Sequence, residues 1–127
     1  MWELHGLPFQ RLIIAYINRF YSTDLIVIDR IKAFISGNPE KGKLAEPGLL
    51  FASQNRVAID AVAVAILRIF GAKEHVGKEN IFGLAQLRRA SELGVAVKFA
   101  SEIHLTPLDD ESREFSEKIK AKLRAEE

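Results

Sequence analysis

Two short runs of the chain are apolar without interruption, and residues that favour turns bound both. Residues 25–28 (LIVI) and 49–52 (LLFA) have the length of strands, and the first is rich in β-branched side chains. A continuously apolar run of this length is typical of a strand covered on both faces. We therefore expect two buried strands, of which the first ends at Asp29 and continues in weaker alternation over residues 31–35.

Longer segments repeat their apolar residues at helical spacing. These segments predict four helices, over residues 8–20, 55–71, 80–94 and 109–124. The second helix is apolar on almost every face, because only Arg56, Asp60 and Arg68 interrupt it. A helix of that composition lies at the centre of a fold, so we expect it to be the most buried helix.

Two further runs, residues 95–99 and 102–105, are candidates for a third and a fourth strand. Strands interleaved with helices predict an α/β fold, with a mixed β-sheet of about four strands and helices packed on it. A loop and not a helix joins the first two strands, so at least one antiparallel pair is expected. With 127 residues, the chain is long enough for one compact domain with its own core.

The connection between the first two strands, residues 36–48, contains three glycines and two prolines. Its candidate ligand-binding residues are Gly37, Asn38, Gly42 and Lys43, because backbone N–H groups in such a loop can cradle a phosphate or a carboxylate. The segment is not a P-loop, since neither serine nor threonine follows the Gly-Lys pair. The alternative is a solvated mobile loop, which a long connection often is.

Two carboxylates stand next to apolar elements and are the candidate metal ligands. Asp29 follows the first strand, at the edge where ligands bind in α/β sheets. Asp60 lies in the first turns of the apolar helix, where the helix dipole favours a negative charge. We expect both side chains to face one cleft bordered by residues 36–42, where they would hold a divalent cation or a transferable proton.

Each carboxylate also has a structural interpretation, and the sequence does not choose between the two. Asp29 can accept backbone N–H groups in a turn at the end of its strand. Asp60 can form an ion pair with Arg56, which lies four residues earlier on the same face of the helix. No complete catalytic constellation is visible, so the sequence leaves open whether the chain is an enzyme.

Composition excludes several classes of function. The net charge of +1 gives no field that would attract nucleic acid. The absence of cysteine excludes disulfides, thiol nucleophiles and an iron–sulfur cluster in this chain. The apolar runs are too short to cross a bilayer and no signal peptide is recognisable, so we expect a cytoplasmic protein without a membrane partner. Charged residues at 28%, no cysteine and one methionine favour a heat-adapted source.

Several of these elements follow one another in the order that one family shows. The strand ending in Asp29 is followed by Gly-Asn-Pro at residues 37–39 and by Phe-Ala-Ser at residues 51–53. The apolar helix then reads Val-Ala-Ile-Asp-Ala-Val-Ala over residues 57–63, and a Leu-Gly turn comes at residues 93–94. With these motifs, the chain resembles the C-terminal part of the proteins grouped as domain of unknown function 362.

The resemblance implies a fold relationship and a redox setting, and no established reaction. The family domain is longer than this chain, so residues 1–127 are expected to be a single α/β domain that corresponds to its C-terminal half. Relatives often carry ferredoxin-type cluster segments, which this chain lacks.

We therefore expect a small-ligand or divalent-metal-binding domain that serves a redox enzyme or complex, with a divalent cation as the candidate cofactor. One alternative is a non-catalytic structural or assembly module that forms a homo-oligomer or pairs with a partner chain. Another is a stand-alone enzyme that uses Asp29 and Asp60.

Overall fold

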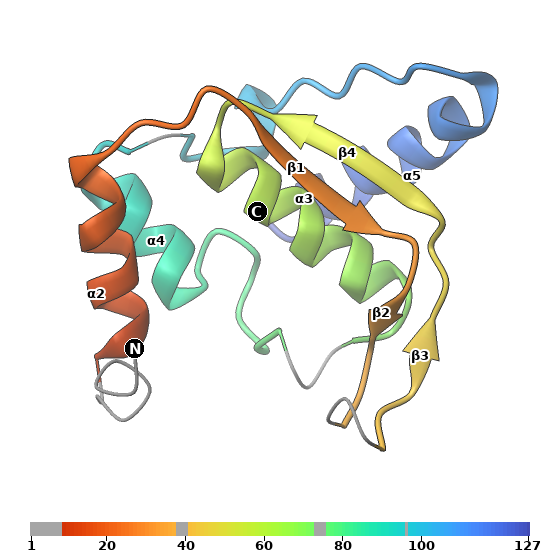
Figure 1. The fold of residues 1–127 in the computed structure, drawn as a ribbon, viewed down its shortest axis with the longest axis horizontal. Helices are drawn as coiled ribbons and strands as arrows, with labels where there is room; N and C mark the ends of the chain where they lie inside the picture. The colour runs from red at the N-terminus through yellow and green to blue at the C-terminus, as the bar shows by residue number, and fades with distance from the viewer. Residues whose placement is uncertain (1–8, 38–40, 73–75, 96) are drawn as a thin grey trace.

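The structure is a computed structural model that describes residues 9–37, 41–72, 76–95 and 97–127. It is an α/β fold, as the sequence predicts, in which helices pack against short strands (Figure 1). In chain order the elements are α2 (Gln10–Ile17), the 3-10 helix η1 (Asn18–Phe20), β1 (Ile26–Arg30), β2 (Ala33–Phe34), β3 (Leu44–Ala45), β4 (Leu49–Ser53), α3 (Arg56–Ile69), α4 (Ala85–Glu92), the 3-10 helix η2 (Ala100–Glu102) and α5 (Asp110–Ala125).

The apolar helix α3 is the centre of the fold. Nine of its 14 residues are buried, more than in any other helix among the described residues, which confirms the prediction. The helix begins where the side chain of Asn55 accepts the backbone N–H of Ala58 at 2.9 Å. It ends at Ile69, and the following Gly71 has a φ of 97°, which allows the N–H of Ala72 to bond the carbonyl of Leu67 at 2.9 Å. Both boundaries therefore follow from local sequence.

Helix α5 supplies a second part of the core. Its N-cap is Asp109, whose side chain accepts the N–H of Ser112 at 2.7 Å, while the Ser112 hydroxyl lies 3.1 Å from the N–H of Asp109. Ile119 and Leu123 are buried and Phe115 packs against the same core, so the apolar residues of this helix face inward. The chain between α4 and α5 carries further apolar side chains onto the same core.

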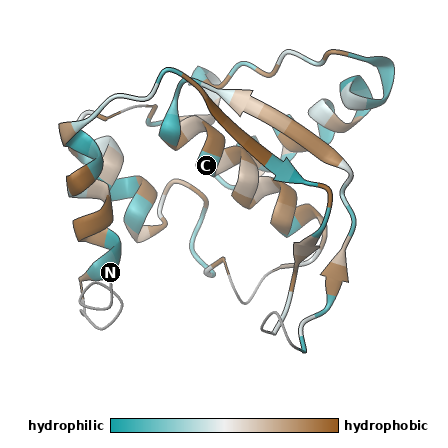
Figure 2. Ribbon diagram, in the orientation of Figure 1, coloured by the Kyte–Doolittle hydropathy of each residue, from teal (hydrophilic) through white to brown (hydrophobic). Residues whose placement is uncertain are grey.

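Strands β1 and β4 form an antiparallel pair in which Ile28 lies opposite Phe51. Both strands cross α3 in Figure 1, and β1 is hydrophobic over most of its length and hydrophilic at its end (Figure 2). Side-chain burial alternates along each strand, so Ile26, Ile28 and Arg30 are half-buried while the residues between them are exposed. The expectation that both faces of these strands are covered is wrong for this chain: α3 covers one face, and the other is open to solvent.

Strands β2 and β3 form a second antiparallel pair, so the four strands make two small ladders in place of one mixed sheet. The glycine-rich loop closes this hairpin, where the N–H of Ile35 donates to the carbonyl of Lys43 at 2.9 Å. Gly37 has a φ of 69°, and a Cβ at this position would lie 2.8 Å from the Cα of Gly42. Glycine is therefore required by the turn itself.

The predicted strands at residues 95–99 and 102–105 are not formed in the described residues. Val97, Ile103 and Leu105 do pack against the core, but no neighbouring strand lies beside them. Local side chains satisfy this backbone instead, since Ser91 donates to the carbonyl of Val97 at 2.9 Å and Glu102 accepts the N–H of Lys98 at 2.6 Å. An apolar run becomes a strand only where a partner is available, and here none is.

Helix α4 begins at Ala85, later than the predicted start at residue 80. The residues before it form turns in which Asn80 accepts the N–H of Gly83 at 2.5 Å. Its predicted end is confirmed: Gly94 has a φ of 71°, and the N–H of Val95 bonds the carbonyl of Ala90 at 3.0 Å. In the described ranges, no helix combines the length and the apolarity that a membrane crossing requires.

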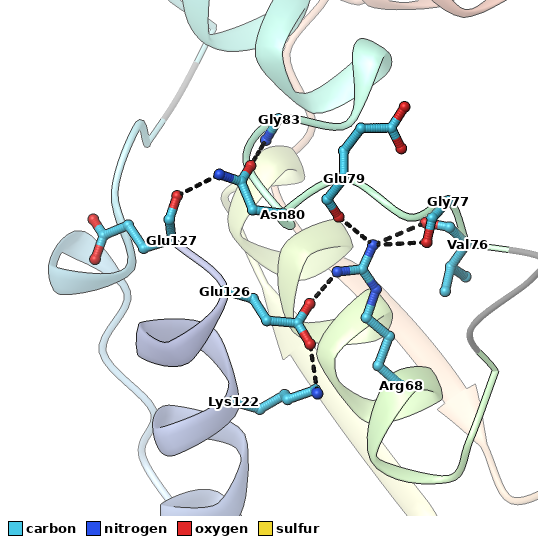
Figure 3. A network of polar contacts seen from close by, with 9 residues as sticks. All are labelled: Arg68, Val76, Gly77, Glu79, Asn80, Gly83, Lys122, Glu126 and Glu127. Carbon is cyan, nitrogen blue, oxygen red and sulfur yellow. Dashed lines mark hydrogen bonds and ion pairs between the residues drawn. The ribbon is translucent and has the colours of Figure 1, made fainter.

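A buried arginine fastens the end of α3 to α5 (Figure 3). Arg68 is 8% exposed, and its guanidinium donates to the carboxylate of Glu126 and to the carbonyls of Val76, Gly77 and Glu79. Burial alone would raise the pKa of Glu126, but hydrogen bonds from Lys122 and Arg68 outweigh it and hold that pKa below its ordinary value. The network adds polar contacts between α3, α5 and the loop over residues 76–79 to the apolar core that α3 and α5 already share.

Candidate functional site

The two predicted metal ligands point away from each other. Asp29 is exposed, and its Oδ1 accepts the N–H of Ile31 at 2.8 Å, which is the turn interaction expected of an aspartate at the end of a strand. Asp60 lies on α3, on the covered side of the sheet, where its nearest cationic influence is Arg30. Because consecutive residues of a strand point to opposite faces, Arg30 and Asp29 lie on opposite sides of β1.

The prediction that Asp29 and Asp60 share one cleft is therefore wrong. Across the part of the chain that the structure describes, no group of three histidine or acidic side chains gathers as a metal site would require. Whether either carboxylate binds a ligand alone stays a prediction.

The glycine-rich loop also lies apart from Asp60. Gly37, Gly42 and Lys43 belong to the tip of the β2–β3 hairpin, which extends from the far end of the sheet (Figure 1). Asn38 lies outside the described residues. None of the described loop residues lines the hollow that contains Asp60, so this part of the loop does not border a site with it.

Arg56 does not form the predicted ion pair with Asp60. Its guanidinium donates to Oδ1 of Asn18 at 3.1 Å and lies over the ring of Tyr21, 4.8 Å from the ring centroid. The start of α3 packs against the turn that follows α2, so a partner from another element replaces the one on the same helix. Asp60 therefore has no ion pair with Arg56, and its surroundings are formed by other elements.

That environment is a cleft of about 280 Å³ between α2, β1, α3 and the start of α4. We call it the arginine cleft. The ionisable side chains among its described lining are Arg11 from α2, Arg30 from β1 and Asp60 from α3. The described residues that line it are Arg11, Arg30, Asp60, Ala63, Val64, Leu67, Val76, Leu84, Ala85, Gln86 and Leu87.

The positions of these side chains follow from the elements that carry them. Arg30 shares the half-buried face of β1 with Ile26 and Ile28, and that face is turned toward α3. Asp60, Ala63, Val64 and Leu67 recur at helical spacing and so lie on one side of α3. Asp60 and the apolar side chains beside it on α3 therefore line the cleft together with Arg30 from β1.

The charges in the arginine cleft are only partly balanced. Burial raises the pKa of Asp60 above its ordinary value of 3.8, and the nearby charge of Arg30 offsets part of that rise. The Nε atom of Arg30 is buried and has no hydrogen-bond partner. Within the described ranges, the guanidinium groups of Arg11 and Arg30 donate no hydrogen bond and form no ion pair closer than 4.0 Å.

A second hollow, of about 360 Å³, lies between α2 and α4 and contrasts with the arginine cleft. Its cations are Arg88 and Arg89, and both pair with Glu92, at 3.9 Å and 3.0 Å. These pairs belong to one helix and have ordinary structural roles. The arginine cleft differs because its two arginines lack such partners.

Sequence reasoning identified Asp60 and missed Arg11, Arg30 and Gln86. The alternation in β1 was a usable signal, since Arg30 occupies the same parity as Ile26 and Ile28 and so had to face the core. Arg11 and Gln86 carry no such signal, because only the docking of α2 and α4 brings them to α3.

Comparison with known proteins gives one family. No curated protein and no solved structure matches the chain. The sequence model of one family, described as Domain of unknown function (DUF362), matches residues 3–65. That range contains β1, the glycine-rich loop, β4 and most of α3, and with them Arg11, Arg30 and Asp60; the Leu-Gly turn at residues 93–94 lies outside it. Through residues 3–65, about half of its length, the chain belongs to the DUF362 family.

Proposed function

We propose that this chain is a small-ligand-binding domain whose ligand occupies the arginine cleft. The observation that carries the proposal is the convergence of two unpaired guanidinium groups and one partly buried carboxylate in a cleft with apolar walls. Polar groups converging in a mostly apolar hollow, with a perturbed pKa among them, are typical of binding sites.

The cost of such an arrangement supports a ligand. A buried donor without an acceptor loses its hydration and gains nothing in return. The same chain shows what a structural arginine does instead: the terminal NH groups of Arg68 donate to one carboxylate and three carbonyls, although its Nε, like that of Arg30, has no partner. Arg30 has no equivalent set of acceptors, which an external ligand would supply.

The proposal keeps the predicted ligand binding and assigns it to the arginine cleft in place of the predicted cleft between Asp29 and the glycine-rich loop. Asp60 remains in the site, while Asp29 and the glycine-rich loop leave it. A divalent cation is disfavoured in this cleft, because two arginines would repel it and one carboxylate would remain to hold it. Service to a redox enzyme, a cytoplasmic location and a heat-adapted source stay predictions, and we propose no reaction.

Amide chemical shifts provide the test. A panel of organic acids, phosphate compounds, neutral metabolites and divalent salts is titrated into the labelled full chain. A ligand of the arginine cleft should shift the amides of Ala63, Val64 and Ala85, and this response should weaken in Arg30→Gln. The control is Arg88→Gln, because Arg88 is exposed and pairs with Glu92 outside the cleft. If no member of the panel shifts the cleft amides, the domain does not have this function.

A second candidate function, assembly, is favoured by the uncovered face of the β1–β4 pair. Val27 and Leu50 are 55% and 71% exposed on that face, and Leu25 and Ile31 extend it at 61% and 55%. An apolar face of this kind marks a contact surface more often than it marks open solvent. A homo-oligomer, or a complex with a partner chain, would cover it, and the arginine cleft on the other side of β1 would remain open.

A further inference from the structure

We infer the chemistry of the ligand: an oxyanion, carboxylate or phosphate, joined to a short apolar body. This inference rests on the proposed function, from which it takes the location of the site. Arg11 and Arg30 would hold the oxyanion, and the apolar wall of α3 would take the body.

The formal charges of the arginine cleft favour an anion. Among the described residues that line it, Arg11 and Arg30 are cations and Asp60 is the one acidic side chain, so these residues carry a net charge of +1 even when Asp60 is ionised. Each guanidinium offers five N–H donors in a planar fork that matches the two oxygens of a carboxylate or phosphate. An oxyanion between the two guanidinium groups would accept hydrogen bonds from both arginines at once.

The walls define the rest of the ligand. Ala63, Val64 and Leu67 line the cleft from α3, and Val76 and Leu84 line it from the chain that follows. A volume of about 280 Å³ lies at the small end of the range for ligand sites, so the apolar body is a few carbon atoms long. A bare inorganic anion would leave that apolar wall in contact with water.

Asp60 couples the bound anion to a proton. Among the described residues that line the cleft, the other ionisable side chains are Arg30 and Arg11. An oxyanion that engages Arg30 brings a second negative charge close to Asp60, so binding favours the neutral carboxyl, which can then donate a hydrogen bond to the ligand. Binding of the oxyanion should consequently tighten as the pH falls toward the pKa of Asp60.

The experiment compares matched ligands on the full chain. Pentanoate, its neutral counterpart pentanamide and inorganic phosphate are titrated separately, and the amide shifts of Ala63 and Ala85 are followed. We expect pentanoate to bind and pentanamide not to, because the two differ only in the anionic group. Arg30→Gln should weaken pentanoate binding by at least about tenfold, since a charge-assisted pair is lost, while Arg88→Gln should leave it unchanged. Arg11→Gln, on the outer part of α2, gives a second variant should Arg30→Gln fail to fold.

The outcomes separate the two levels of the proposal. Binding of phosphate in preference to pentanoate would retain the oxyanion and assign it to the phosphate class, without the apolar body. Equal binding of pentanamide and pentanoate, or undiminished binding in both arginine variants, would overturn the oxyanion inference and leave the arginine cleft as a ligand site. Failure of every compound in the wider panel to shift the cleft amides would overturn the proposed function itself.

Discussion

Replacing Arg68 with methionine tests whether the buried network of Figure 3 holds the fold together. Methionine keeps much of the aliphatic length of arginine and removes the guanidinium. Among the described residues, the carboxylate of Glu126 would then keep Lys122, at 2.5 Å, as its one ion-pair partner. The carbonyls of Val76, Gly77 and Glu79 would lose the donor that lies 2.8–3.2 Å from them.

The expected loss follows from what each broken contact is worth. Removing one partner of a buried ion pair costs roughly 3–5 kcal/mol of unfolding free energy. The side chain of Glu126 is 20% exposed and retains Lys122, which places the Glu126 part of the loss at the lower end. The three carbonyls add a smaller amount, because water can reach groups on a loop once the guanidinium is gone. We therefore expect Arg68→Met to lower the free energy of unfolding by about 3 kcal/mol.

Urea unfolding followed by circular dichroism measures this loss, and the melting temperature should fall by about 10 °C. Arg124→Met is the matched control, because Arg124 is an exposed arginine of α5 and its replacement should change stability by less than about 0.5 kcal/mol. The double variant Arg68→Met/Glu126→Gln should lose much less free energy of unfolding than the two single variants lose in sum, since both changes remove the same ion pair. A loss below about 1 kcal/mol in Arg68→Met would refute the reasoning and show that the network is peripheral.

Three further expectations concern the core, the cleft and the open face. Ala61 is fully buried, so Ala61→Asp should cost at least about 3 kcal/mol in urea unfolding, whereas Ala121→Asp on the exposed side of α5 should cost little; similar losses would mean that α3 is not central. Burial raises the pKa of Asp60 above 3.8 in the folded chain. At pH values between the unfolded and the folded pKa, Asp60 is therefore protonated in the folded chain and ionised in the unfolded chain, and stability falls as the pH rises through this interval. Asp60→Asn should therefore stabilise the chain at neutral pH and lose this advantage in acid, and an advantage that persists in acid would contradict the assignment. Leu50→Lys on the open face should reduce the mass measured by light scattering, and a wild-type chain that is already monomeric would leave assembly without support.

The sequence could predict what depends on neighbours along the chain. The predicted ranges 55–71 and 109–124 lie close to the observed α3 and α5, because the caps Asn55, Gly71 and Asp109 interact with residues no more than a few positions away. The apolar runs that became β1 and β4 were recognised because each is an uninterrupted apolar segment bounded by residues that favour turns. Together these elements were sufficient for the α/β class, because alternating strands and helices leave few ways of burying their apolar faces.

The sequence could not predict which polar groups meet. The glycine-rich loop was assigned to a site, but its glycines are required by the hairpin turn, where Gly37 and Gly42 approach each other. Arg56 was expected to pair with Asp60 on its own helix, and it contacts Asn18 and Tyr21 instead. A pairing of two residues on one helix can be predicted from their spacing in the sequence. A competing partner from another element cannot, because it comes within reach only when the two elements pack together.

Local sequence thus determined the elements, their ends and the presence of Asp60 in a largely apolar helix, because helical periodicity and capping act over a few residues. Tertiary structure alone decided that residues 95–99 and 102–105 lack a strand partner and that one face of β1 is open. It also brought Arg11, Arg30 and Asp60 to one cleft from three elements. The physical reason is that ladder pairing, burial and charge balance depend on groups distant in sequence, whose positions are fixed only when the helices and strands pack.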